Sequence, residues 1–183
     1  MKISFNWLKQ FIHTDKNPEE ISLILTAIGL EVESVEKVQT IAGGLDGLVI
    51  GYVKDCIQHP NADRLKITTV DAGTGQDLQV VCGASNVAPG QRIVLATVGT
   101  TVYPVNGEPF KINKSKIRGE ISEGMICAED EIGLGTSHDG IIVLGEDARV
   151  GLPAKEYFRI SDDYLFEIGL RLVVCSHFGR GKL

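Results

Sequence analysis

The sequence predicts an α+β fold in which a β-barrel is inserted in a small split α/β domain. Three observations favour this fold. Residues 48–144 contain short alternating apolar and polar stretches separated by glycine-rich turns, which is typical of a small barrel. Residues 1–28 instead carry apolar side chains at helical spacing. A glycine-rich boundary, residues 43–47, separates the two periodicities.

The barrel is predicted to be five-stranded and of the oligonucleotide-binding (OB) type, because short strands and tight turns suit a Greek-key barrel. Residues 84–90 leave room for only a turn or a short helical piece where such barrels usually carry a helix. The expected strands are 48–57, 65–71, 78–82, 93–97 and 125–128, with another short strand at 141–144.

The first 39 residues are predicted to form helix, helix and strand. Ser4 is a suitable N-cap for the first helix. Asn17 and Glu20 have the spacing of a capping box for the second, and Gly29 supplies a left-handed stop. Its buried stripe is expected to contain Ile21, Ile24, Leu25 and Ile28.

Three segments follow from these patterns. Residues 1–39 form the first half of the split α/β domain, 40–151 the barrel, and 152–183 the second half, which contains a strand near 163–168. Two short helices cannot close a core alone, so the last segment is expected to pack against the first.

Composition excludes several classes of protein. No apolar run approaches the roughly 18–20 residues that span a bilayer, and Lys9 and His13 interrupt any signal peptide, so we expect a cytoplasmic protein without a membrane partner. The four cysteines contain no CxxC pair, so we expect no metal site. No P-loop, GxSxG, HExxH or GxGxxG motif is present, so no catalytic residue is predicted.

The charge pattern argues against a general nucleic-acid binder. The net charge is −6, and residues 40–151 carry nine basic and fourteen acidic side chains. Four basic residues nevertheless fall within eight positions with no acid between them: Lys111, Lys114, Lys116 and Arg118. Any phosphate contact should therefore be local and sensitive to salt, although a solvated hairpin with solubilising lysines explains the same stretch equally well.

A second turn-rich signature, residues 59–65, precedes the basic stretch by about fifty residues. Pro60 keeps His59 out of the helical region, and Asp63 or Asn61 can fix the turn through hydrogen bonds to backbone N–H groups. We therefore expect a structural turn that presents Arg64 and Lys66 beside the barrel, with the contact role of both left open.

The order of these elements resembles the tRNA-binding module that is appended to several aminoacyl-tRNA synthetases. The flanks narrow the resemblance. Residues 5–9 (FNWLK), 29–36 (GLEVESVE) and 163–170 (DYLFEIGL) are similar to the beginning of the bacterial phenylalanyl-tRNA synthetase β subunit. Residues 171–183 depart from the family pattern, which continues with a Thr-Pro-Asn-Arg stretch, and the family's subunits are several times longer. The resemblance therefore implies an N-terminal fragment with an atypical end.

The resemblance also implies a function. The family attaches phenylalanine to its tRNA with ATP and magnesium in an α2β2 enzyme, whose catalytic residues lie outside this segment, so the fragment is expected to bind tRNA without a cofactor. Two alternatives remain: a structural or assembly module with little tRNA contact, and a stand-alone tRNA-binding protein. The tRNA-binding candidates are Arg64, Lys66, Asn86, Lys114, Lys116, Arg118 and Ser122.

Overall fold

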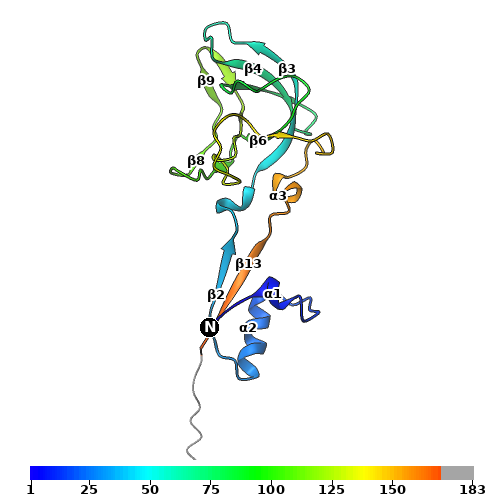
Figure 1. Cartoon of the computed structure of the whole chain (residues 1–183), viewed down its shortest axis with the longest axis vertical. Coiled ribbons are helices and arrows are strands. Elements are labelled where there is room, and N and C mark those ends of the chain that lie inside the picture. Colours follow the sequence, from blue (N-terminus) through cyan, green and yellow to red (C-terminus); the bar gives the residue numbers. More distant parts are fainter. Residues whose placement is uncertain (170–183) are drawn as a thin grey trace, which may run out of the picture. The chain divides into compact units, whose positions relative to one another are not determined.

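A computed structural model of the chain describes residues 1–169 (Figure 1). The chain divides into two compact units. Unit 1 combines Met1–Val38 with the segment that begins at Asp162, and unit 2 is Gln39–Ser161. The atypical end predicted for residues 171–183 lies outside the described residues.

Unit 1 contains two helices and a three-stranded sheet in the order β1-β13-β2. The capping box predicted at the second helix is confirmed, since Asn17 Oδ1 accepts from Glu20 N at 2.8 Å and Glu20 Oε2 accepts from Asn17 N at 3.0 Å. The elements are β1 (Lys2–Ser4), α1 (Phe5–Leu8), α2 (Pro18–Ala27), β2 (Val32–Gln39) and β13 (Asp162–Ile168).

The core of unit 1 forms where α1 and α2 meet β13. Phe5 and Phe166 pack edge to face with ring centroids 5.9 Å apart, and Ile21 is buried beside them. The buried stripe of α2 is narrower than predicted, because Ile24 and Ile28 are 41% and 69% exposed. Helical spacing locates an apolar face but does not say how much of that face the unit covers.

Unit 2 is mostly antiparallel β-structure that forms a nearly closed, barrel-like sheet in the order β11-β6-β3-β4-β5. Strands β5 and β11 approach each other, and Glu123 N donates to Gln79 O at 2.8 Å across this seam. The sheet strands are β3 (Leu48–Gln58), β4 (Lys66–Asp71), β5 (Asp77–Cys82), β6 (Arg92–Thr97), β11 (Gly124–Ile126) and β12 (Val143–Leu144).

Smaller elements complete unit 2. Residues 84–90 form turns, as the short segment predicts. The remaining elements are η1 (Ala42–Leu45), β7 (Thr101–Val102), β8 (Phe110–Lys111), β9 (Ser115–Ile117), β10 (Glu120–Ser122) and α3 (Ala154–Tyr157).

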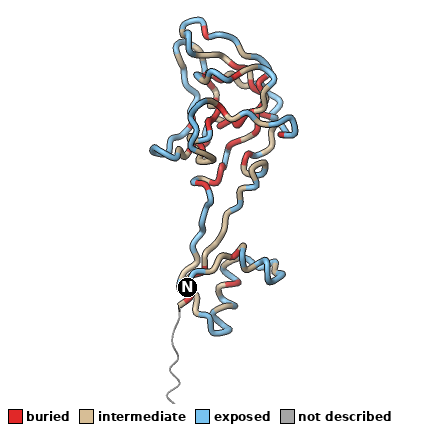
Figure 2. The backbone as a smooth tube through the Cα atoms, viewed as in Figure 1, coloured by how far each residue is buried: buried red, intermediate tan, exposed pale blue. Residues whose placement is uncertain are grey.

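The core of unit 2 follows from the alternation along its strands (Figure 2). Val53, Val80 and Ile93 are fully buried on one side of the curved sheet. Ile50 and Val94 belong to a second cluster. The basic side chains of the candidate site lie in the connections between these sheet strands, outside both clusters.

No helix among residues 1–169 is long and apolar enough to cross a membrane.

Candidate nucleic-acid interface

The second half of the basic stretch predicted from the sequence folds into a two-stranded hairpin, whereas Lys111 lies in β8. Strands β9 and β10 pair so that Ile117 lies opposite Glu120, which leaves Arg118 and Gly119 as a two-residue turn. Both turn residues have positive φ, 51° and 105°, as tight hairpins of type I′ require. Glycine adopts this conformation freely, whereas arginine does so rarely, so the turn holds Arg118 at an exposed tip at some conformational cost.

Side-chain hydrogen bonds hold this hairpin against β5. The Gln79 amide donates to Ile121 O at 2.9 Å. Ser122 Oγ accepts from Val81 N at 3.1 Å and donates to Gly124 O at 3.0 Å. Ser122 is only 2% exposed, so its hydroxyl is committed to this seam. The hairpin is thereby fixed to the barrel along its second strand.

The turn at residues 59–65 is joined to the same hairpin by a buried histidine. His59 is 2% exposed, and its Nδ1 accepts from Asn61 N at 3.0 Å. This bond places the ring proton on Nε2, which donates to Ile117 O at 3.2 Å. Two signatures that are about fifty residues apart in sequence therefore meet next to the hairpin turn.

Three cationic side chains at this edge are exposed and form no hydrogen bond or ion pair within residues 1–169: Arg64, Lys116 and Arg118. Lys114 differs, because its Nζ lies 2.7 Å from Glu123 Oε1. The hydrogen bond from Lys114 lowers the pKa of the Glu123 carboxyl below its ordinary value. The edge thus offers three unpaired positive charges and one that is already neutralised.

Two other predicted site residues form side-chain hydrogen bonds to backbone groups within unit 2. Lys66 Nζ donates to Val87 O at 2.8 Å and to Ser85 O at 3.2 Å, which ties β4 to the loop after β5. The Asn86 amide donates to Ile141 O and accepts from Ile141 N, both at 3.0 Å. The structure therefore places Asn86 against Ile141 rather than with the hairpin.

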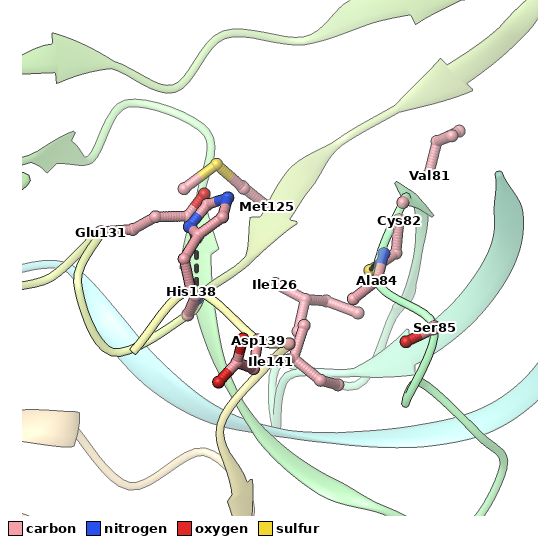
Figure 3. A pocket seen from close by; sticks show the side chains of 13 residues that line it. Val81, Cys82, Ala84, Ser85, Met125, Ile126, Glu131, His138, Asp139 and Ile141 are labelled. Atoms are coloured by element: carbon pink, nitrogen blue, oxygen red, sulfur yellow. Dashed lines mark hydrogen bonds between the residues drawn. The ribbon is translucent and has the colours of Figure 1, made fainter. Parts of the chain in front are cut away.

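A hollow that the sequence did not indicate lies further along the β5–β11 seam (Figure 3). Its volume is about 530 Å³. In Figure 3, Glu131, His138 and Met125 lie on one side of it, opposite Val81 and other residues of the β5 end. His138, Asp139 and Gly140 line this hollow from the segment between β11 and β12, and no local motif in the sequence indicates that they do.

The Asp130 carboxylate lies 3.0 Å from His138 Nδ1, and the hydrogen bond between them raises the pKa of His138 above its ordinary value. Within residues 1–169, no group of three or more His, Cys, Asp or Glu side chains is arranged to hold a metal ion.

The fold and this edge define a class: a mostly antiparallel, barrel-like β module with an exposed cluster of basic side chains. Residues 48–153 match the family described as "Putative tRNA binding domain", and the chain belongs to that family. The predicted resemblance to a tRNA-binding module is therefore confirmed.

The chain is also similar to phenylalanine–tRNA ligase β subunits over nearly its whole length, which confirms the resemblance seen in its flanks. It is 57% identical to that of Bacteroides fragilis over 182 residues, 98% of this chain and 22% of the relative. The corresponding subunit of Porphyromonas gingivalis is 54% identical over the same shares, and that of Geobacter metallireducens is 45% identical over 93% of this chain and 20% of the relative. The chain thus spans about a fifth of the length of the curated relatives it matches.

Among solved structures, a MetRS-related protein from Pyrococcus horikoshii is similar to 57% of this chain and 85% of that chain, with 20% identity and a TM-score of 0.41. A TM-score this low supports no conclusion about the fold or the function of the chain.

Proposed function

We propose that unit 2 binds tRNA through the edge where the turn at residues 59–65 meets the β9–β10 hairpin. The observation that carries this proposal is the hydrogen bond of buried His59 to Ile117 O, because it brings the cations of two distant signatures to one edge. Arg64, Lys116 and Arg118 contact phosphates, since their side chains have no partner within the described chain. Lys114 joins them when tRNA displaces Glu123.

We further propose that the barrel is a five-stranded OB fold made by β3, β4, β5, β6 and β11. In this arrangement the turn at residues 59–65 connects the first two strands, and the hairpin lies between the last two. OB folds bind oligonucleotides with these two connections. The antiparallel order of the sheet supports the assignment. The barrel would then occupy residues 40–151, between the two halves of a split α/β domain at 1–39 and 152–183.

The chain would act as the tRNA-binding part of a cytoplasmic phenylalanine–tRNA ligase β subunit. The printed names of its relatives support this role. In the whole enzyme an α subunit, in an α2β2 assembly, would carry out ATP- and magnesium-dependent aminoacylation. The present segment would bind tRNA without catalysing that reaction.

The test is a fluorescence-anisotropy titration of the chain with labelled tRNA at several salt concentrations. Three or four phosphate contacts should give a slope of log affinity against log salt of about −2 to −4. Lys116→Glu should reduce both the affinity and the steepness of the slope. The matched control is Arg149→Glu, which makes the same charge change at another exposed side chain of unit 2.

An equal loss of affinity in both variants would show that only net charge matters and would contradict the proposed edge. Absence of binding even at low salt would favour an architectural role for the barrel.

A further inference from the structure

We infer that the hollow beside Met125 receives one unpaired base of the bound RNA, namely a base that carries an exocyclic amino group. This inference rests on the proposed function and adds to it a site for a base. It is independent of the basic edge in its chemistry, because bases are recognised by shape and hydrogen bonds, whereas phosphates are recognised by charge.

The hollow has the size of a small-molecule site, and its lining mixes polar and apolar groups. Its volume of about 530 Å³ lies within the range of such pockets, which are largely apolar with a few polar groups. Apolar side chains from β5, β11 and the loop before β12 line it, and Glu131 and His138 lie together on one side (Figure 3). The apolar side chains are Val81, Cys82, Ala84, Met125, Ile126, Ala128 and Ile141.

The polar side of the hollow favours an amino group and disfavours a phosphate. Glu131 is held in place because its Oε2 accepts from Ala128 N at 2.7 Å, while its other oxygen forms no hydrogen bond within the described chain. A carboxylate oxygen accepts hydrogen bonds from the amino groups of bases. Asp139 and His138 line the same hollow, and the His138 imidazole is already paired with the Asp130 carboxylate, so a phosphate there would face two carboxylates without a free cation.

Met125 supplies a surface for the face of the base. Its side chain is half-buried and unbranched, and thioether sulfur makes favourable contacts with aromatic rings. Single-strand binders usually stack bases on aromatic side chains, and the barrel contains few of these. Met125 would take their place as the surface that contacts the base.

The charge of the lining changes from acidic in the first hollow to basic in a second one along the seam, and this difference would orient the nucleotide. A second hollow of about 350 Å³ shares Val81 and Met125 with the first and is lined by Lys111, Asn113 and Ser115. Lys111 is exposed and unpaired within the described residues, so this second hollow suits a phosphate. The backbone would lie on the basic side, and its base would enter the hollow that holds Glu131.

The composition provides a direct reporter for this site. Met1 and Met125 are the only two methionines in the sequence, so methyl-labelled methionine places a single NMR probe in the hollow. The probes are cytidine 5′-monophosphate, uridine 5′-monophosphate and ribose 5-phosphate, titrated into the full chain. Cytidine and uridine monophosphates have the same size and charge but differ in the amino group.

We expect the cytidine nucleotide to shift the Met125 methyl signal with a dissociation constant of about 1 mM. The uridine nucleotide should bind about fivefold more weakly, because its carbonyl oxygen would face the Glu131 carboxylate. Glu131→Gln keeps an acceptor for Ala128 N and should abolish this preference. Glu146→Gln, the same change at an exposed carboxylate outside the hollow, should leave it intact.

Three results would overturn the inference: no shift of Met125 with either nucleotide, an equal shift with ribose 5-phosphate, or tighter binding of a simple diamine, which would indicate a cation site. The tRNA titration separates this failure from failure of the proposed function. Salt-dependent tRNA binding without a shift of the Met125 signal on adding nucleotide would rule out the base site and leave the tRNA function standing. A shift of the Met125 signal on adding nucleotide, without tRNA binding, would rule out the tRNA function and leave the nucleotide site standing.

Discussion

The hairpin edge and the contact between β4 and the loop at residues 84–90 both carry long polar or basic side chains but use them differently. At the edge, Lys116 and Arg118 extend from a tight hairpin with no partner among the described residues. At the second region, Lys66 of β4 and Asn86 of the loop use their polar atoms on backbone groups. Residue type supplies the chemistry of both regions, but the hydrogen bonds already made within the fold decide which side chains are free for a ligand.

The largest effect is expected at Ser122, where a predicted contact residue is buried in the seam. Ser122→Ala leaves Val81 N without its acceptor and should lower the free energy of unfolding by about 2 kcal/mol. Chemical denaturation measures this loss. The tRNA affinity of the folded fraction should stay unchanged, and a tenfold fall in affinity without loss of stability would show that Ser122 contacts RNA directly.

Arg64 and Lys66, which are two residues apart, offer the sharpest form of the comparison. Lys66→Met removes the hydrogen bonds to Ser85 O and Val87 O and should cost about 1 kcal/mol of stability with no change in the salt slope. Arg64→Met should leave stability unchanged and make the slope shallower by about 1. Denaturation and salt titrations of both variants check this, and matching profiles would contradict the distinction between them.

At the hairpin turn, stability and affinity should change in opposite directions. Arg118 has a φ of 51°, a conformation that asparagine adopts more readily. Arg118→Asn should therefore raise the free energy of unfolding by about 0.5 kcal/mol, while loss of a phosphate contact lowers tRNA affinity about fivefold. Thermal unfolding and anisotropy measure the two effects. Unchanged tRNA affinity would show that Arg118 does not contact tRNA.

The sequence predicts elements best where local chemistry decides them. The capping box of Asn17 and Glu20 and the alternating strands of the barrel are local patterns, and both are present. The exposure of Ile24 and Ile28 could not be predicted, because it depends on how much of α2 the rest of unit 1 covers. Strand β1 was missed, since a three-residue strand has too few positions to show alternation.

The candidate site was predictable in part for the same reason. Clustered basic residues and a turn motif identify the two signatures, but nothing local shows that His59 would bond to Ile117 O. Side-chain partners across the seam, such as Ser122 with Val81 N, are likewise products of the tertiary fold. The hollow lies beyond sequence reasoning because residues from three separate segments enclose it.

The smallest expected effect concerns His138 at the rim of the hollow. The hydrogen bond to the Asp130 carboxylate raises the pKa of His138 above the ordinary value of 6.5. Since the folded pKa is higher than the unfolded one, this pair stabilises the fold fully below about pH 6.5, and the contribution is lost as pH rises through the folded pKa. NMR titration of the imidazole should give a pKa above 6.5, and Asp130→Asn should return it towards that value. An unchanged pKa in the variant would mean that Asp130 does not cause the shift.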